Sequence, residues 1–179
     1  AVANLKNLKM GDQVSISINK EDKWKNAHFM MASGPLLVQN GKTNMTINSQ
    51  SPRATARTAR TAVAIDKTGK KVFMVTVDVK KGRSAGMTLK EFADHLVKVG
   101  AYKAINLDGG GSTTLAARIP GNQFATLINA PAGGSQRAVS AILEVISTAP
   151  TGPMKNIVVK RQTSGNFLIG GSTGFTVTG

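Results

Sequence analysis

The most informative stretch of this sequence is Ala104-Ile105-Asn106-Leu107-Asp108-Gly109-Gly110-Gly111-Ser112-Thr113. Its first four residues predict a short buried strand, and the three glycines lack the Cβ atoms that would keep backbone N–H groups away from an anion. The run lacks the Gly-Lys-Ser/Thr end of a P-loop and the spaced glycines of a dinucleotide-binding fold. Because Asp-Gly is also an ordinary turn, composition alone leaves both an anion-binding loop and a plain turn open.

A helix is predicted just upstream of this strand, over residues 89–99. Thr88 and Glu91 form a capping box, in which each side chain satisfies a free backbone N–H group. Gly100 supplies the C-terminal stop. The apolar residues between these signals form one stripe, which consists of Leu89, Phe92, Ala93, Leu96 and Val97.

Strand signals lie on both sides of the helix, as runs of β-forming residues separated by turn residues. The expected strands are residues 14–18, 33–38 before the Asn40-Gly41 turn, 61–66 and 71–79 joined by residues 67–70, 104–107, and 115–118 and 124–128 around residues 120–122. Residues 43–60 are polar and predict an exposed loop, whereas residues 137–146 are apolar without a decided state. We therefore expect an α+β fold, with a mixed or antiparallel sheet and the 89–99 helix packed on it.

The chain has 179 residues, 41% of them hydrophobic, which is enough to bury the core of one domain. Residues 1–148 are predicted to form that domain. Residues 149–155 contain Ala-Pro-Thr-Gly-Pro and predict a linker. Residues 156–179 resemble the start of a bacterial immunoglobulin-like β-module, so we expect a truncated β tail.

Charge and composition restrict the classes of partner. Lys and Arg number 23 against nine Asp and Glu, and the net charge of +14 attracts polyanions. Aromatic residues, which nucleic-acid binders place among their basic residues, make up only 4% of the chain, so nucleic acid is disfavoured. The absence of cysteine excludes disulfides and thiolate chemistry. No membrane span is predicted, and any export signal is expected to lie outside this chain.

The candidate catalytic carboxylates are few. Most of the nine acidic residues fall at the helix cap, on the helix surface, in turns or in polar stretches. Asp78 and Asp108 each follow an apolar strand, where a carboxylate is well placed for acid–base or nucleophilic work. Glu144 is a weaker third candidate, and a solvated strand end is the competing interpretation of Asp78.

Arginine and histidine supply the candidate binding residues. Arg57, Arg60 and Arg137 lie among small Thr- and Ser-containing segments, where guanidinium groups can grip phosphate, although each is also compatible with a plain surface charge. His28 precedes the Phe-Met-Met and Gly-Pro segment and is the better placed of two histidines. The two are too far apart in sequence to indicate a metal site.

Five blocks follow one another along residues 28–147. They are Ser33-Gly34-Pro35-Leu36-Leu37-Val38, Arg57-Thr58-Ala59-Arg60-Thr61-Ala62-Val63, Gly86-Met87-Thr88-Leu89, Asn106-Leu107-Asp108-Gly109-Gly110-Gly111-Ser112-Thr113-Thr114 and Arg137-Ala138-Val139-Ser140. In this order they resemble the phosphodiester glycosidase family, which includes the uncovering enzyme N-acetylglucosamine-1-phosphodiester α-N-acetylglucosaminidase. Five blocks in register are far more specific than any one of them.

The resemblance implies hydrolysis of the bond between a sugar's anomeric carbon and a phosphodiester. For a bacterial member it implies an extracellular or cell-surface protein acting on sugar-phosphate polymers of N-acetylglucosamine-1-phosphate type. No cofactor is expected, and the sequence leaves a divalent-cation requirement open. Asp108 would activate water or orient the sugar, Asp78 would be the second carboxylate, and Arg60 and Arg137 would clamp phosphate. The other expected substrate-binding residues are Asn106, Gly109, Gly110, Gly111, Ser112, Thr113, Arg57 and His28.

The chain departs from the family pattern at three places. No Asn-Gly-Gly-Phe-Phe-like motif precedes the five blocks, so another segment or a second chain is expected to complete the domain. Ala141 stands where the family has Asn, and Val79-Lys80-Lys81 replaces a Gly-Arg. The alternative function is therefore a non-catalytic module that binds an anionic cell-wall polymer. A nucleic-acid binder is the third interpretation.

Overall fold

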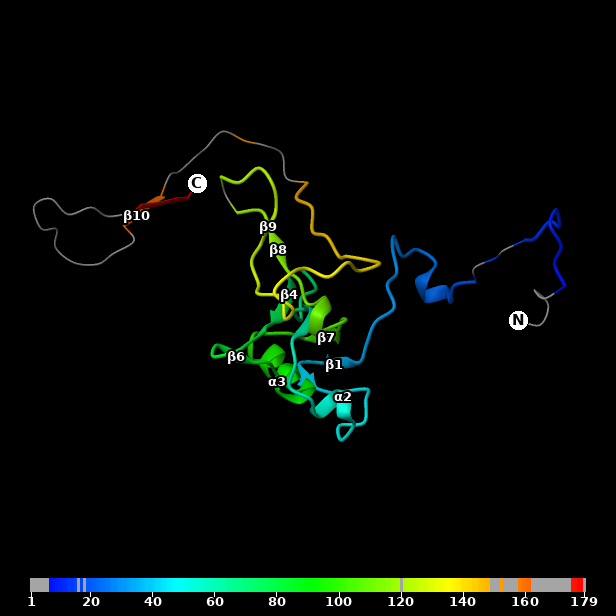
Figure 1. Cartoon of the computed structure of the whole chain (residues 1–179), viewed down its shortest axis with the longest axis horizontal. Coiled ribbons are helices and arrows are strands. Elements are labelled where there is room, and N and C mark those ends of the chain that lie inside the picture. Colours follow the sequence, from blue (N-terminus) through cyan, green and yellow to red (C-terminus); the bar gives the residue numbers. More distant parts are fainter. Residues whose placement is uncertain are drawn as a thin grey trace, which may run out of the picture. The chain divides into compact units, whose positions relative to one another are not determined.

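The computed structural model of the chain describes residues 7–15, 17, 19–119, 121–148, 152, 158–161 and 175–178. Contacts divide the chain into two units, residues 1–32 and 33–179, and each is described by itself. In the first unit, the described residues form one short 3-10 helix, η1 (Asp22–Trp24) (Figure 1). Of the strand predicted at residues 14–18, residues 16 and 18 lie outside the described residues, and residues 14, 15 and 17 are exposed and belong to no strand.

The second unit contains a five-stranded antiparallel sheet in the order β2-β1-β7-β3-β4. The strands are β1 (Leu36–Gln39), β2 (Lys42–Thr43), β3 (Arg60–Ile65), β4 (Val72–Val77) and β7 (Lys103–Asn106). The predicted β1–β2 and β3–β4 hairpins are confirmed. Asn40 and Gly41 have φ values of 54° and 72°, which a tight two-residue hairpin turn requires. The later strand β7 lies between the two hairpins.

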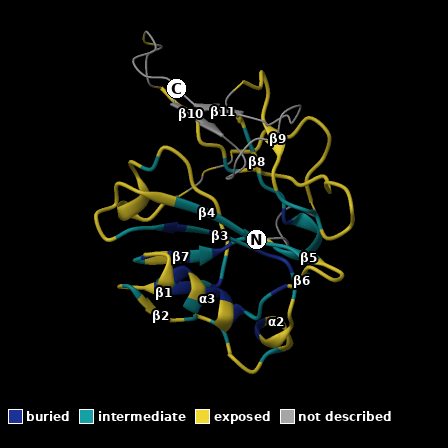
Figure 2. Ribbon diagram, turned by 90° about the vertical axis from the view of Figure 1, so that its left-hand side faces the viewer, coloured by how far each residue is buried: buried dark blue, intermediate teal, exposed yellow. Residues whose placement is uncertain are grey.

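Helix α3 (Leu89–Lys98) covers one face of this sheet, so the α+β prediction is confirmed. Both bonds of the predicted capping box are present between Thr88 and Glu91. Phe92 and Leu96 are fully buried, and the core around them includes residues of β1, β3 and β7. Figure 2 shows the buried residues gathered where α3 meets the sheet.

Residues 43–60 are mostly exposed, as their polarity predicts, but they are not all loop. They contain a short helix, α2 (Pro52–Thr55), in which Ser51 Oγ accepts a hydrogen bond from the Ala54 amide. Ser at the N-cap and Pro at the first helical position favour a helix start even in a polar segment. Ala54 and Ala59 are buried as a result, and α2 packs against α3.

The remaining elements are short. They are β5 (Val79–Lys80), β6 (Ser84–Ala85), the 3-10 helix η2 (Gly110–Ser112), β8 (Ala116–Ala117), β9 (Thr126–Leu127), β10 (Val158–Arg161) and β11 (Phe175–Thr178). The hairpin predicted between residues 115 and 128 is confirmed as the β8–β9 pair. The apolar residues 137–146 form neither helix nor strand.

Strands β10 and β11 pair antiparallel within the predicted tail, but most of that tail and of the linker lies outside the described residues. The predicted domain boundaries stay predictions. Among the described residues, no helix has the length and apolar character needed to cross a membrane.

Candidate active site

Asp78 and Asp108 follow strands that end at the same edge of the sheet. Strand β3 runs antiparallel to both β4 and β7, so β4 and β7 end where β3 begins. Arg60 at the start of β3 pairs with Val77, and the Leu107 amide donates to Thr61 O at 2.8 Å. The two carboxylates therefore follow strands that are two strand spacings apart, roughly 10 Å.

The glycine run begins with a close backbone approach to the segment before β3. The Gly110 amide donates to Ala59 O at 2.8 Å. A Cβ added at Gly109 would lie 2.7 Å from the same oxygen, closer than a Cβ atom tolerates. Gly110 has a φ of 59°, in the left-handed region that favours glycine. These two glycines are therefore required by the path of the chain, whatever the loop binds.

Most amides of the run have partners within the protein. The Gly109 amide donates to Asp108 Oδ1 at 3.0 Å, and the amides of Ser112 and Thr113 donate to the carbonyls of Gly109 and Gly110. Among the described residues, the Gly111 amide has no hydrogen-bond partner. The Gly111 N–H is therefore the backbone donor of this run that remains for an anion.

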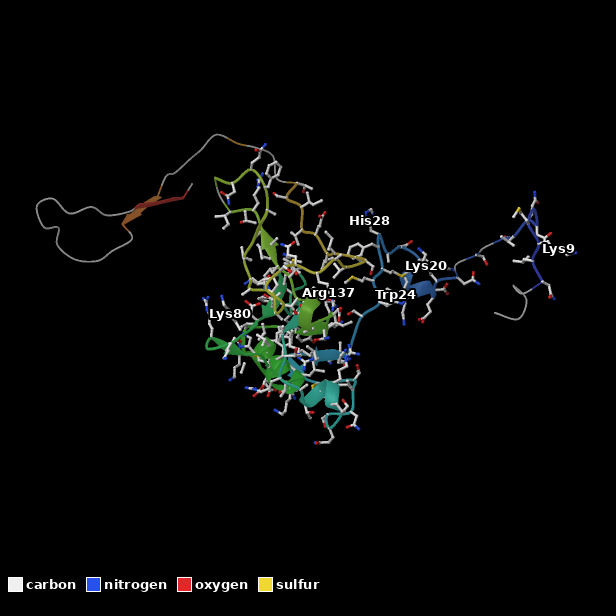
Figure 3. All side chains as sticks on the ribbon, viewed as in Figure 1. Lys9, Lys20, Trp24, His28, Lys80 and Arg137 are labelled. Atoms are coloured by element: carbon white, nitrogen blue, oxygen red, sulfur yellow. The ribbon has the colours of Figure 1, made fainter. Side chains whose placement is uncertain are left out.

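Arg137 brings a positive charge to this loop. Its Nη2 atom lies 3.3 Å from Asp108 Oδ2 and also donates to Ser112 Oγ. The guanidinium packs along Gly111, where an added Cβ would lie 3.4 Å from Nη1. Figure 3 shows Arg137 beside the ribbon of the sheet and the loop. Three of the predicted site residues, Asp108, Ser112 and Arg137, are therefore in direct contact.

The surroundings of Asp108 favour its ionised form. The hydrogen bond with Ser112 lowers the pKa of the Asp108 carboxyl most, and the Gly109 amide and the charges of Arg137 and Arg53 lower it further. Partial burial acts in the opposite direction. At neutral pH the group is a carboxylate, suited to accept a proton and not to donate one.

Sequence reasoning missed Arg53, which lies in α2. Its Nη2 donates to Gly34 O at 3.2 Å, and its charge acts on both Asp108 and Arg60. The sequence signal that could have indicated Arg53 is Ser51-Pro52, a pair typical of a helix start. A helix that begins there fixes the position of the next residue, Arg53.

The structure gives Arg60 and Arg57 protein partners. Arg60 is 5% exposed, and its guanidinium donates to the carbonyls of Met87, Arg53 and Ala56 at 3.0, 3.1 and 2.6 Å. Burial and then the charge of Arg53 lower its pKa. Arg57 forms an ion pair with Glu91 at the start of α3. These contacts hold α2 and α3 near the sheet, and substrate binding by either arginine stays a prediction.

Asn106 is 3% exposed at the end of β7. Its Nδ2 donates to the carbonyls of Gly34 and Leu107, and its backbone O accepts from Ser33 Oγ at 2.8 Å. Among the described residues, Asn106 Oδ1 is buried and has no hydrogen-bond partner. The first and fourth sequence blocks therefore meet at this residue.

Asp78 is linked to the glycine run through Asn129, a second residue that sequence reasoning missed. Asp78 Oδ1 accepts from Asn129 Nδ2 at 2.9 Å, and Oδ2 accepts from the Ala130 amide at 2.8 Å. Asn129 also donates to Thr113 O and accepts from the Leu115 amide. Thr113 is fully buried and its hydroxyl bonds to that of Thr61. No local pattern marked Asn129, because its partners lie 14 to 51 residues away.

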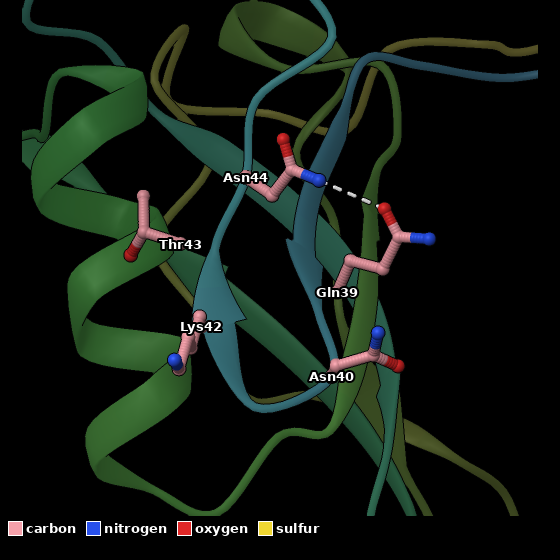
Figure 4. Close-up of a pocket in the computed structure, with 5 residues that line it drawn as sticks. All are labelled: Gln39, Asn40, Lys42, Thr43 and Asn44. Atoms are coloured by element: carbon pink, nitrogen blue, oxygen red, sulfur yellow. Dashed lines mark hydrogen bonds between the residues drawn. The ribbon is translucent and has the colours of Figure 1, made fainter.

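His28 and a hollow on the β1–β2 hairpin are two further features of the described residues. His28 is exposed in the first unit, and its role in substrate binding stays a prediction. A hollow of about 660 Å³ lies along the β1–β2 hairpin, lined by Gln39, Asn40, Lys42, Thr43 and Asn44 (Figure 4). None of these five residues belongs to the loop or its contacts. Among the described residues, no group of three His, Cys, Asp or Glu is placed to hold a metal ion.

The model of the phosphodiester glycosidase family matches residues 2–146, which include every residue of this site. The chain belongs to the phosphodiester glycosidase family. The comparison with curated proteins gives no match.

Two solved structures resemble parts of this phosphodiester glycosidase chain. A hypothetical protein from Synechocystis is 38% identical over 47% of this chain and 16% of its own, with a TM-score of 0.40. The catalytic domain of zebrafish N-acetylglucosamine-1-phosphodiester alpha-N-acetylglucosaminidase, auto-inhibited by its pro-peptide, is 27% identical over 56% of this chain and 34% of its own, also with a TM-score of 0.40. The chain thus spans about a third or less of either protein.

Proposed function

We propose that this chain hydrolyses sugar-1-phosphodiesters of N-acetylglucosamine-1-phosphate type, in glycopolymers of a bacterial cell surface. The contact of Arg137 with Asp108 and Ser112 on the glycine run carries this proposal. It places a cation that can bind phosphate against a carboxylate that is ionised at neutral pH. Membership of the phosphodiester glycosidase family supports the reaction class.

In the proposed reaction, the substrate phosphate binds Arg137 in place of the Asp108 and Ser112 oxygens. The Gly111 N–H is a further donor to the phosphate. Asp108 then accepts a proton from the water that attacks the anomeric carbon. The bond between that carbon and the phosphate oxygen breaks, and the bonding electrons leave with the phosphate monoester. Arg137 stabilises the charge that develops on this leaving group, so a general acid contributes less than in other glycosidases.

The test uses a nitrophenyl phosphodiester of N-acetylglucosamine in water enriched in ¹⁸O. We expect the label in the sugar hydroxyl and none in nitrophenyl phosphate, measured by mass spectrometry. Asp108→Asn should reduce turnover by about 100-fold or more, since a general base contributes roughly 10²–10⁴. The control Asp22→Asn changes an exposed acid in the first unit and should leave turnover unaltered.

Label in the phosphate would instead indicate a phosphodiesterase and contradict the proposal. Saturable binding of the substrate without turnover by the native chain would support the non-catalytic module.

A further inference from the structure

Next to Asp78 lies a second hollow, with a volume of about 420 Å³. Its walls come from the β5–β6 hairpin on one side and from the segment after β9 on the other. The lining residues are Asp78, Lys80, Arg83, Ser84, Ile128, Asn129 and Ala130. The volume lies within the range of small-molecule sites, roughly 300–1,000 Å³. None of the five sequence blocks contains a residue of this lining.

The hairpin is fixed to the end of β4 by Ser84. The Ser84 hydroxyl donates to the Asp78 carbonyl and accepts from the Gly86 amide. Gly86 has a φ of 73°, and an added Cβ would lie 2.5 Å from Thr58 O, so the chain is held closely where it leaves the hairpin. The polar atoms of Ser84 are therefore engaged internally, and the cations are the groups left for a ligand.

The cations of this hairpin form no ion pair with the described acidic residues. Lys80, Lys81 and Arg83 are exposed, and none of them forms an ion pair within the part of the chain that the structure describes. Asp78 is the one acidic residue of the lining, and its carboxylate oxygens face the N–H groups of Asn129 and Ala130. Figure 3 shows Lys80 on the β5–β6 hairpin. An anion in the hollow would meet the two cations of Lys80 and Arg83 and the single carboxylate of Asp78.

Asn129 connects this hollow to the glycine run. It lines the hollow, and its Nδ2 donates to Thr113 O at the end of the loop that carries Asp108 and Ser112. The hollow and the loop thus share one edge of the sheet. A ligand that fits both the hollow and the loop would be a polymer with a negative charge on each of two successive repeats.

We infer that the hollow between Lys80, Arg83 and Asn129 is a second anion subsite, which binds the phosphate of a neighbouring repeat unit in a sugar-phosphate polymer. This inference rests on the proposed function and adds a preference for polymeric over monomeric substrate. The cations of the β5–β6 hairpin bind one phosphate of the polymer while the adjacent sugar-phosphate linkage lies at Arg137.

The test compares a synthetic trimer of N-acetylglucosamine 1-phosphate with the nitrophenyl monomer. In the variant K80A/R83A, we expect the ratio of kcat/KM on the trimer to kcat/KM on the monomer to fall about tenfold, because two charge-assisted contacts are lost. The control K67A/K70A removes the same charge from the turn between β3 and β4, at the other end of the sheet. It should leave this ratio unaltered at physiological salt. An unchanged ratio in K80A/R83A, or an equal fall in both variants, would overturn the subsite.

A binding measurement separates this inference from the proposed function. If the native chain hydrolyses neither substrate, the proposed function fails, and fluorescence anisotropy with a labelled trimer still tests the subsite. We expect K80A/R83A to weaken trimer binding about tenfold and K67A/K70A to leave it within twofold. An equal loss of affinity for a single-stranded DNA of the same charge would show a non-selective basic surface and contradict a glycopolymer subsite.

Discussion

Arg137 Nη2 lies 3.3 Å from Asp108 Oδ2, although 29 residues separate the two in sequence. The same nitrogen donates to Ser112 Oγ. One cation therefore contacts both a carboxylate and a hydroxyl of the glycine run. In the proposed reaction, phosphate binding at Arg137 would release Asp108 for proton transfer, and this contact would couple binding to catalysis.

The pH dependence of the reaction should change when Ser112 is replaced by alanine. In the proposed reaction the ionised Asp108 is the active form, so we expect the rate to be full above its pKa and to be lost as the pH falls through it. The hydrogen bond with Ser112 is the main cause that lowers this pKa. Ser112→Ala should therefore move the acidic limb of kcat/KM to higher pH, measured as a pH–rate profile. Ser135→Ala, at an exposed position, should not move it.

Arg137 and Arg57 should differ in kinetic importance. Arg137→Gln should lower kcat/KM by about 100-fold, since it removes a cation from the developing phosphate charge. Arg57→Gln breaks the ion pair with Glu91 on the exposed surface and should change kcat/KM less than about threefold. Steady-state kinetics of the two variants give the comparison. Equal losses of kcat/KM in the two variants would support the prediction that Arg57 binds the substrate.

Gly109 should be sensitive to the smallest side chain. The Cβ of Gly109→Ala would lie 2.7 Å from Ala59 O, and we expect a loss of about 1–3 kcal/mol in the free energy of unfolding. Gly133→Ala adds the same methyl group where nothing lies within 4 Å and should cause no loss. Urea denaturation measures both. Equal stability of the two variants would contradict the close approach of Gly109 to Ala59 O.

Asp78 and Asn129 should behave as one unit. Replacing either with alanine leaves polar groups of the other without a partner, so the two losses of stability should not add. A double-mutant cycle should give a coupling energy of about 1–2 kcal/mol. The kinetics of Asp78→Asn then test its role as second carboxylate. A fall in kcat much greater than that of Asn129→Ala would support direct participation in the reaction.

Local patterns predicted the regular elements well. The capping box and apolar stripe gave the bounds of α3, and turn residues located the β1–β2 and β3–β4 hairpins. These signals succeed because each depends on residues that are close in sequence. The isolated alternation at residues 14–18 gives no strand at the described residues 14, 15 and 17, because a strand also needs a neighbour, which a single segment cannot reveal.

The candidate site was less predictable than the fold. The charge and shape of Arg60 suggested phosphate binding, yet its guanidinium meets the carbonyls of α2 and of Met87. Such bonds depend on which segments pack beside β3, and no spacing along the chain encodes this. Arg53 and Asn129 were missed for the same reason, since their partners come from other segments.

The position of β7 has a consequence for synthesis of the chain. Both hairpins that flank β7 in the sheet are complete in sequence before residues 103–106 emerge from the ribosome. Until then β1 and β3 each present an unpaired edge, which is prone to association with other chains. Insertion of β7 closes both edges at once and places the Asp108 loop in the same step. Nascent chains released before residue 103 should therefore aggregate, whereas those released after the loop should not.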